Sequence, residues 1–222
     1  MPNSKKIYGL IPLRKGSTRI KNKNFMKVLN KPLYQYASDQ ALKSKLINRL
    51  FISTDSNKIK SNNKKLSIIS RSKASSTNYA STELVIEEFL RKYDCDYLVL
   101  IQATNPFLKT KHIDQGIMKI LKNKKKFDTV LSAVKSEHFV WKKNNKGCIF
   151  PKNYNYKKRT RMQDTKLDEF IENGAFYVFS SAGFKKNKNR LYGKITYIEM
   201  PKESVFEVDD KEDLKIIKKL LR

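Results

Sequence analysis

The sequence predicts an α/β protein with a mostly parallel sheet and helices on both faces. Short apolar runs alternate with amphipathic helical segments through residue 134, which is the pattern of repeated strand–helix–strand units. The run from Tyr97 to Ile101 is continuously apolar, as in a strand that is covered on both faces. No apolar run approaches the ~20 residues of a membrane span, so no association with a membrane is expected.

Each expected element follows from a local pattern. Strands are expected where apolar runs end in a polar or turn residue, at 7–12, 49–54, 66–70, 97–101, 129–134, 175–179 and 195–200. Helices are expected from apolar side chains at helical spacing, at 30–44, at 82–93, after a cap at Thr110, and from Asp209 or Asp210 onward. Residues 138–170 are polar, aromatic and basic. We expect them to form a hairpin or arm inserted into a single domain of residues 1–222.

Composition limits the class of protein. The 222 residues are 39% hydrophobic and include 12 Phe and 11 Tyr, which indicates a globular chain. Cys95 and Cys148 are too few and too scattered for a disulfide scaffold or a zinc site, and MPNSKKIYGL lacks the apolar core of a secretory signal. A reducing, cytoplasmic compartment is therefore expected. The net charge of +27 permits binding of nucleic acid or of an anionic substrate, but lysine is spread through every segment, which favours an enzyme with a basic surface.

The loop after the first expected strand has the composition of an anion site. Leu10 to Phe25 reads LIPLRKGSTRIKNKNF and contains a glycine, two hydroxyl residues and five cations. Gly16 would let backbone N–H groups approach an anion, and the cations would neutralise its charge. The spacing matches neither GxxxxGK[ST] nor GxGxxG. The alternative is a solvated basic loop in a lysine-rich chain.

Polar side chains follow four of the expected strands. They are Arg14, Ser17 and Lys23 after the first, Asp55 after the second, Arg71 after the third and Gln102 after the fourth. In open α/β sheets, ligands bind outside the carboxyl ends of the strands. Each residue alone would be typical of a turn or a solvated loop, but their common placement predicts one crevice.

The segment SVFEVDDKED suggests a metal site. Glu207 and Asp209 flank Val208, and residues two apart on an extended segment point to the same side. Two adjacent carboxylates repel unless a cation lies between them, and Mg²⁺ prefers oxygen ligands. Helix capping by Asp209 or Asp210 is the alternative, although it leaves Glu207 unexplained.

Five segments carry a resemblance to a known family. They are IPLRKGSTRIKNKN, FISTDS, IQATNPF, ENGAFYVF and SVFEVDDKEDL. In order and spacing they resemble segments of the acylneuraminate cytidylyltransferases, the CMP-sialic acid synthetase family, over nearly all of the chain. The resemblance implies a Rossmann-like nucleotidyltransferase fold and a homodimer to which the inserted arm contributes. It also implies transfer of CMP from CTP to a nine-carbon 2-keto (nonulosonic) sugar acid, with release of pyrophosphate.

The resemblance also implies roles for the matched residues. Arg14, Ser17, Lys23 and Asn24 would hold the phosphates or sugar of CTP, and Arg71, Ser81 and Thr82 would contact the nucleotide. Gln102 would lie where nucleotide and sugar acid meet. Lys142, Arg161 and Tyr177 would line the sugar-acid site, with part of the arm reaching a partner subunit. Glu207 and Asp209 would bind Mg²⁺, and Arg14, Lys23 and Asp209 would form the catalytic set.

Two departures from the family pattern keep alternatives open. Thr18 stands where the family usually has Lys, and Glu207 where it usually has Asp. Ser-Thr-Arg at 17–19 resembles the cytidylyltransferase for the eight-carbon acid 3-deoxy-manno-octulosonate, although that enzyme has GDEPF where this chain reads ATNPF. A nucleic-acid-binding protein on the same fold, using Trp141, Tyr154 and Tyr156, is the other alternative.

No protein general base is evident in the sequence. His112 and His138 lie outside the loops expected to line the crevice. A metal-activated sugar hydroxyl is therefore the expected nucleophile. The pattern does not select among sialic, legionaminic and pseudaminic acids, which share the same core groups.

Overall fold

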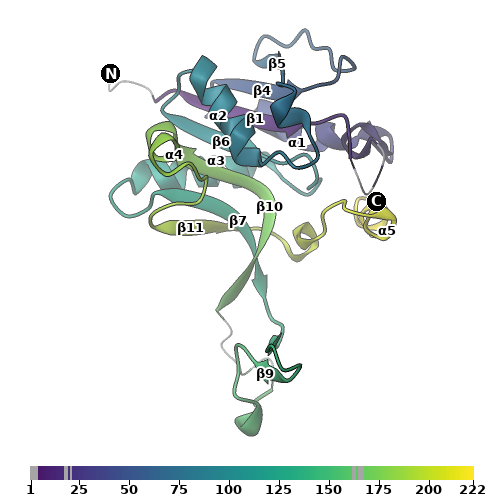
Figure 1. Ribbon diagram of the computed structural model, residues 1–222, viewed down its shortest axis with the longest axis vertical. Coiled ribbons are helices and arrows are strands. Elements are labelled where there is room, and N and C mark those ends of the chain that lie inside the picture. Colours follow the sequence, from purple (N-terminus) through teal and green to yellow (C-terminus); the bar gives the residue numbers. More distant parts are fainter. Residues whose placement is uncertain (1–4, 18–19, 21, 162–163, 165–167) are drawn as a thin grey trace.

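A seven-stranded sheet forms the centre of the computed structural model, which describes residues 5–17, 20, 22–161, 164 and 168–222. In spatial order the strands are β11 (Ile195–Glu199), β7 (Thr129–Ser136), β10 (Glu169–Ser180), β6 (Tyr97–Ile101), β1 (Ile7–Leu13), β4 (Arg49–Thr54) and β5 (Leu66–Ser70) (Figure 1). Four of the six neighbouring pairs are parallel, and β10 runs antiparallel to both of its neighbours. The predicted mostly parallel sheet is confirmed.

Helices cover both faces of this sheet, as predicted. On one face, α1 (Leu33–Lys43) and α3 (Thr110–Lys122) pack against Ile11 and Val99. On the other face, α2 (Thr82–Lys92) and α4 (Ser181–Asn187) pack against Leu10 and Phe51. Leu10 and Ile11 belong to different core clusters because successive side chains of a strand point to opposite faces.

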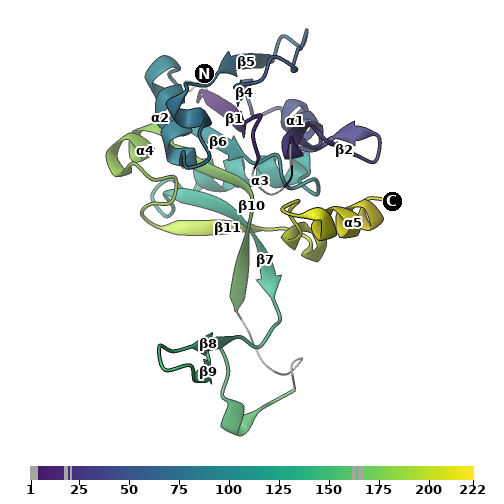
Figure 2. The same cartoon turned by 45° about the vertical axis from the view of Figure 1, so that its right-hand side comes forward.

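The last helix, α5 (Lys211–Leu220), lies apart from these two layers (Figure 2). Its Ile217 packs with Val208, Leu33 and Phe107 in a third apolar cluster. Val208 is fully buried, so its side chain belongs to the core. This cluster fixes the chain segment that carries Glu207 and Asp209.

The predicted hairpin arm projects from the sheet between β7 and β10 (Figures 1 and 2). It contains the antiparallel pair β8 (Trp141–Lys143) and β9 (Ile149–Pro151), followed by the short helix η3 (Tyr156–Lys158). Phe139 stacks on Tyr154 with ring centroids 4.2 Å apart. Ile149 is nevertheless 63% exposed, so the arm leaves apolar side chains in solvent.

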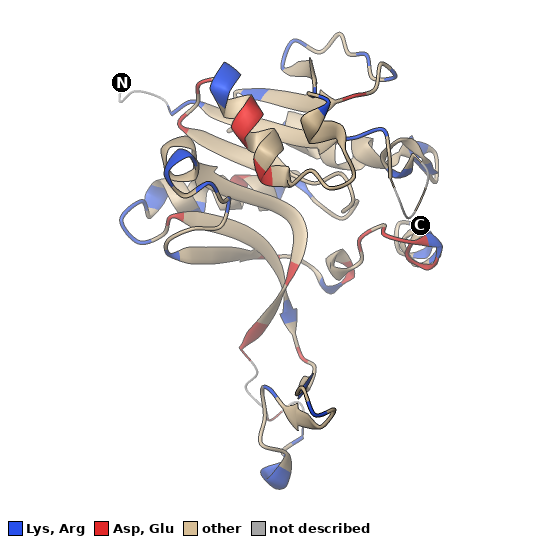
Figure 3. Ribbon diagram, viewed as in Figure 1, with Lys and Arg blue, Asp and Glu red and all other residues tan. Residues whose placement is uncertain are grey.

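The remaining ordered segments are short. They are η1 (Lys23–Phe25), the pair β2 (Lys27–Val28) and β3 (Lys31–Pro32), η2 (Ala74–Ser76) and η5 (Lys202–Val205). Lys and Arg occur on helices, loops and the arm alike (Figure 3), in keeping with a bias of the whole chain. Of the helices in the described residues, none is long and apolar enough to cross a bilayer.

Several element boundaries differ from the prediction. Lys109, not Thr110, occupies the N-cap of α3, because the Thr110 hydroxyl donates to the Gln40 carbonyl oxygen at 2.9 Å. Helix α1 begins only after Pro32, whose neighbour Lys31 pairs in β3. Strand β10 begins at Glu169 instead of residue 175, since its polar first half pairs with the end of β7. Helix α4 was not predicted at all.

Substitution of Gly116 should test the packing of α3 on the sheet. An added Cβ at this position would lie 2.6 Å from Cε2 of Phe176, which is buried below the helix. Gly116→Val should therefore lower the free energy of unfolding by about 1–3 kcal/mol through overpacking, as measured by urea denaturation. Met118→Val, at a position of the same helix that is 36% exposed, is the matched control. Equal effects of the two substitutions would contradict the packing described.

Candidate active site

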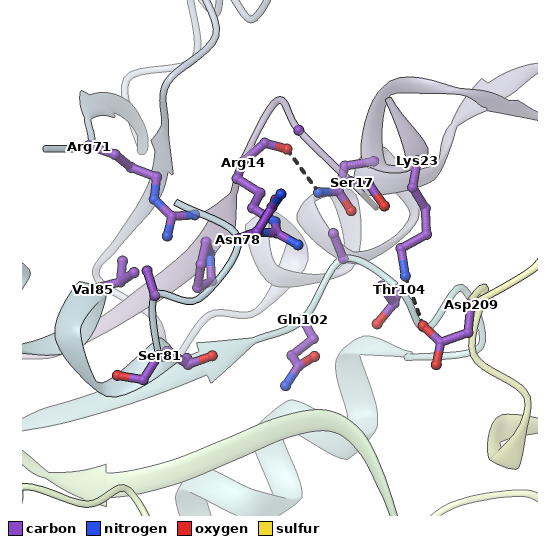
Figure 4. A pocket seen from close by; sticks show the side chains of 16 residues that line it. Arg14, Ser17, Lys23, Arg71, Asn78, Ser81, Val85, Gln102, Thr104 and Asp209 are labelled. Carbon is purple, nitrogen blue, oxygen red and sulfur yellow. Dashed lines mark hydrogen bonds and ion pairs between the residues drawn. The ribbon is translucent and has the colours of Figure 1, made fainter. Parts of the chain in front are cut away.

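A cavity of about 340 Å³ lies at the carboxyl ends of the parallel strands (Figure 4). Nine residues singled out from the sequence line it: Arg14, Ser17, Lys23, Asn24, Arg71, Ser81, Thr82, Gln102 and Asp209. The elements that supply them are far apart in the chain. In the sheet, however, β6 is next to β1, and β5 is separated from β1 only by β4, so the loops after all three strands reach one edge. The structure thus brings together the residues predicted to contact the nucleotide, together with Gln102.

The loop after β1 is held in place by hydrogen bonds to its backbone. Asp55, at the end of β4, accepts from the Lys15 N–H at 2.6 Å, and the Asn24 amide donates to the Arg14 carbonyl oxygen at 3.3 Å. An added Cβ at Gly16 would meet nothing within 4 Å, so the backbone there borders open space. Asp55 therefore holds the loop in position without lining the cavity, and residues of the loop itself line it. Thr18 lies outside the described residues.

The guanidinium groups of Arg14 and Arg71 line the cavity. Nη1 of Arg14 donates to the Thr77 carbonyl oxygen at 3.1 Å and to Oδ1 of Asn78 at 2.9 Å. Nη2 of Arg71 donates to the Ser75 carbonyl oxygen, while its Nε is buried and has no partner among the described residues. Burial lowers the pKa of Arg71, against the attraction of Asp55. A buried donor left unpaired is costly, so this wall favours a hydrogen-bond acceptor or an anion.

The start of α2 supplies another part of the cavity wall. Ser81 is its N-cap, and its hydroxyl oxygen accepts from the Leu84 N–H at 3.2 Å. Thr82 is the first helical residue. The free N–H groups and the dipole of a helix N-terminus favour negative charge, which adds to the positive potential of Arg14 and Arg71.

A cation and a carboxylate face each other at the far end of the cavity. Nζ of Lys23 lies 2.9 Å from Oδ1 of Asp209 (Figure 4). Lys23 is 13% exposed and Asp209 is 47% exposed. Asp209 does not cap α5, because Asp210 occupies the N-cap and accepts from the Asp213 N–H. Capping therefore explains Asp210 and leaves the Asp209 carboxylate for the cavity.

Glu207 lies behind this pair. Its Oε2 accepts from the Thr104 hydroxyl at 2.9 Å, and Thr104 lines the cavity. An added Cβ at Gly174, whose φ is +63°, would lie 2.6 Å from Oε1 of Glu207, so glycine leaves the room that the longer side chain needs. Burial, followed by the charge of Asp209, raises the pKa of Glu207.

These oxygen donors fit a divalent cation that is shared with a phosphate ligand. The described residues contain no cluster of three His, Cys, Asp or Glu that could hold a metal alone. Mg²⁺ typically takes one or two carboxylates and completes its shell with phosphates and water. A cation near Asp209 and Glu207 would also relieve the repulsion that raises the Glu207 pKa.

The residues predicted to bind the sugar acid lie outside this cavity. Lys142 is exposed on β8, and Arg161 is on the arm, where Nε lies 2.7 Å from Oδ2 of Asp164. Tyr177 is only 2% exposed, and its hydroxyl donates to Glu172. The structure does not bring Lys142 or Arg161 to the cavity of their own chain, because the arm projects away from the sheet.

The histidines lie away from the cavity, as expected from the sequence. Nδ1 of His112 accepts from the Lys109 N–H at 3.3 Å in the first turn of α3. Burial lowers the pKa of His112 to about 4, so the ring is neutral at pH 7. His138 is at the base of the arm.

Sequence reasoning missed Asn78 and Thr104. Asn78 belongs to a polar stretch without periodicity, and it reaches Arg14 only through a contact 64 residues apart in the chain. Thr104 was part of IQATNPF, but nothing in the sequence indicated that it would meet Glu207. Asn105 was also missed, because its contacts lie far away in the chain. Its side-chain amide donates to the carbonyl oxygens of Asn173 and Ser204, which joins the loop that carries Thr104 to β10 and η5.

Comparison with known proteins identifies the class. The family model for cytidylyltransferases matches residues 8–220, and the chain belongs to this family. It is 32% identical over 216 residues to N-acylneuraminate cytidylyltransferase A of Danio rerio, covering 93% of this chain and 48% of that protein. It is 29% identical over 226 residues to pseudaminic acid cytidylyltransferase of Campylobacter jejuni serotype O:2, covering 96% of this chain and 95% of that protein.

A bacterial relative and two solved structures extend the comparison. The N-acylneuraminate cytidylyltransferase of Escherichia coli O18:K1:H7 is 26% identical over 219 residues, covering 95% of this chain and 51% of that protein. The chain thus spans about half the length of these N-acylneuraminate relatives. The 4-diphosphocytidyl-2C-methyl-D-erythritol synthase of Anaerococcus prevotii superimposes with a TM-score of 0.69 at 13% identity, covering 99% of both chains. A CMP:2-keto-3-deoxy-manno-octonic acid synthetase superimposes with a TM-score of 0.66 at 14% identity, covering 97% of this chain and 98% of that chain. These two likenesses concern the fold, which is a Rossmann-like nucleotidyltransferase fold.

The stability of the protein should report the environment of Glu207. A raised carboxyl pKa means that the folded state holds the proton more tightly than the unfolded chain. The stabilisation from that proton is complete below the ordinary pKa of 4.5 and is lost as the pH rises through the folded pKa. Glu207→Gln should therefore be more stable than the unsubstituted protein at pH 7 and equally stable below about pH 4.

The measurement is urea denaturation between pH 3 and pH 8 in the presence of a chelator. Glu212→Gln is the control, because Glu212 is 75% exposed on α5. A Glu207→Gln variant that is less stable than the unsubstituted protein at pH 7 would show that the negative charge is favourable where it lies.

Proposed function

We propose that this protein transfers CMP from CTP to a nonulosonic acid of the sialic type and releases pyrophosphate. The observation that carries the proposal is the single cavity that collects Arg14, Lys23, Arg71, Gln102 and Asp209 at the carboxyl ends of the strands. The names of the relatives, which concern N-acylneuraminate and pseudaminic acid, support a nine-carbon acceptor over 3-deoxy-manno-octulosonate.

The cavity suits a nucleoside triphosphate because it concentrates positive charge. Arg14 and Lys23, with backbone N–H groups beside Gly16, would bind the phosphates, and Arg71, Ser81 and Thr82 would contact the nucleoside. Nucleotidyl transfer depends mainly on positioning and on neutralising the charge that builds up on the leaving group. Fixed cations that need no reorganisation therefore lower the barrier directly.

Asp209 and Glu207 would hold Mg²⁺ together with the substrate phosphates. When bound, the ion would offset the charge on the leaving pyrophosphate and help to orient it. Lys23 keeps the Asp209 carboxylate directed toward the cavity, and Thr104 does the same for Glu207. Gln102 would lie between the α-phosphate and the incoming sugar hydroxyl.

The sugar-acid site is proposed to be completed by a second subunit. The side chain of Arg161 is 75% exposed, and Lys142 is also exposed. Both residues are on the arm, away from the cavity of the same subunit. The arm also exposes Trp141, Ile149, Phe150 and Tyr156, each by more than 40%. In a two-fold symmetric dimer, an arm of this kind would bury these side chains and bring Arg161 to the partner's acceptor site. There its guanidinium would bind the sugar carboxylate in bidentate fashion.

The cytoplasm is the proposed compartment. Cys95 and Cys148 are both unpaired thiols, one buried and one exposed. An exposed unpaired thiol is typical of a reducing environment.

The proposed reaction is tested by measuring pyrophosphate release. The purified protein is incubated with CTP, Mg²⁺ and each of four acids: N-acetylneuraminic, legionaminic, pseudaminic and 3-deoxy-manno-octulosonic acid. Turnover with at least one nine-carbon acid is expected, with CTP preferred to UTP. Turnover confined to 3-deoxy-manno-octulosonic acid, or absent with all four acids, would overturn the proposal.

Asp209→Asn should remove activity while leaving the fold intact. Asparagine keeps the size of the side chain and can still accept from Lys23, and the helix cap is at Asp210. Loss of the charge should reduce kcat at least about 100-fold at any practical Mg²⁺ concentration. Glu207→Gln should cost about tenfold. The matched control is Asp210→Asn, which preserves capping and should retain activity. A folded Asp209→Asn variant with near-normal kcat would refute the metal site.

Mixing two impaired variants, assayed at a sugar-acid concentration far below the KM of Arg161→Ala, should show whether Arg161 acts in the partner subunit. In a mixed dimer of Arg161→Ala and Asp209→Asn, one site has its own Asp209 and the partner's Arg161 intact, and the other site lacks both. Random exchange should therefore restore activity at about a quarter of all sites. If Arg161 served its own subunit, every site would lack one group and mixing would restore nothing. Arg161→Ala alone should raise the KM for the sugar acid and leave the KM for CTP unchanged.

A further inference from the structure

A row of charged and polar side chains crosses the apolar face of the sheet that α2 covers. Arg190 lies over the ring of Tyr177, with Cζ 4.7 Å from the ring centroid, and its Nη1 donates to the Glu83 carboxylate. The Tyr177 hydroxyl donates to the Glu172 carboxylate. The neighbours of Tyr177 on this face include Leu10, Leu100 and Phe179. The row therefore interrupts a cluster that is otherwise apolar.

The register of the sheet places this row beside the cavity. Tyr177 on β10 pairs with Leu100 on β6, two residues before Gln102, so Leu100 and Gln102 lie on the same side. The Gln102 N–H donates to the Ala175 carbonyl oxygen at 3.0 Å, which fixes the two strands together at the edge of the cavity.

Both ends of the row meet walls of the cavity. At one end, Glu83 directly follows Thr82, which lines the cavity. At the other end, β10 continues from Glu172 to Gly174, where an added Cβ would lie 2.6 Å from Oε1 of Glu207. Glu207 is bonded to Thr104, another lining residue. The row thus runs alongside Gln102 on the β10 side of the cavity.

The pairing inside the row leaves capacity for a ligand. Nε of Arg190 is buried without a partner among the described residues, and an unsatisfied buried donor in a folded protein calls for an explanation. Glu172 is an exposed residue, and Tyr177 occupies its Oε1. An ionised carboxylate has about four lone-pair sites, so it can accept further hydrogen bonds from O–H or N–H groups.

We infer that this row is the floor of the sugar-acid subsite, where Glu172 accepts hydrogen bonds from hydroxyl or amide N–H groups of the acceptor. Arg190 is a positioning residue: it holds Tyr177 and the start of α2 in the arrangement that directs Glu172 toward the cavity. The inference rests on the proposed function and deepens it. It assigns the recognition of the polyhydroxylated, N-acylated part of the sugar acid to the chain that also binds the nucleotide.

The experiment measures the two Michaelis constants separately in the pyrophosphate-release assay, with the nine-carbon acid that the unsubstituted protein turns over best. Glu172→Ala should raise the KM for the sugar acid about 10- to 100-fold, as expected for loss of hydrogen bonds to a charged group. Glu172→Gln, which can still accept, should restore part of this loss. The KM for CTP should stay within about twofold in both variants.

Arg190→Met should shift the sugar-acid KM in the same direction as Glu172→Ala, and Arg190→Lys should lie between Arg190→Met and the unsubstituted protein. Lys188→Met is the matched control. Lys188 also ties the segment after α4 to α2, through Glu87 at 2.8 Å, but it is 62% exposed and outside the cavity. It should change neither constant. Circular dichroism checks folding, and if Arg190→Met does not fold, Arg190→Lys and the two Glu172 variants carry the test.

The outcomes separate this inference from the proposed function. An unchanged sugar-acid KM in folded Glu172→Ala would overturn the subsite while leaving the proposed reaction intact. Equal increases in both constants would also overturn it, because the row would then support the cavity as a whole. An unsubstituted protein that turns over none of the acids would overturn the proposed function, and the subsite with it.

Discussion

The parallel pairing of β1 with both β4 and β6 is the constraint on which the cavity depends. Residues of β1 pair in register with residues 49–54 on one side and 97–100 on the other, so their carboxyl ends emerge at one edge. The loops that follow then have to share that edge, whatever their distance in the chain. At this edge the Asp55 carboxylate accepts a hydrogen bond from the Lys15 N–H. This bond holds the backbone of the basic loop in one position, so the loop is not simply a solvated segment.

Because the strand pairing fixes these loops, positive groups and carboxylates are separated along the cavity. Arg14, Arg71 and the N-terminus of α2 face one end, while Asp209 and Glu207 approach the other through the buried anchor Val208. The carboxylates come close enough for the Asp209 charge to help raise the Glu207 pKa. Such repulsion is tolerated only when it is compensated elsewhere. Lys23, which pairs with Asp209, supplies part of that compensation, and the proposed Mg²⁺ would supply the remainder.

Local patterns were sufficient to predict the seven strands of the sheet and the helices on both faces other than α4. Five cavity residues were predictable because they follow strand ends: Arg14, Ser17, Lys23, Arg71 and Gln102. Asn24, Ser81 and Thr82 were singled out by the family resemblance alone, and Asp209 by its spacing from Glu207. Contacts made by register were not predictable. Arg190 meets Glu83 across 107 residues, and Thr104 meets Glu207 across 103; neither pair leaves a periodic or compositional trace. The start of β10 at Glu169 was missed because its first residues are polar and pair with β7 beyond the core. The N-cap at Lys109 was missed because a tertiary contact with Gln40 engages the Thr110 hydroxyl.

The proposed binding sites for CTP and for the sugar acid differ in how far a single subunit can form them. The described residues around the cavity proposed to bind CTP are held by contacts within one subunit, such as Asp55 to Lys15 and Lys23 to Asp209. The proposed acceptor side would combine strand β10 with the arm, whose Phe150 and Ile149 are exposed. Apolar surface of this kind is stabilised when a partner covers it. A second subunit that covered the arm would therefore complete the acceptor site in the same step, so assembly and recognition of the sugar acid would be coupled while nucleotide binding would not.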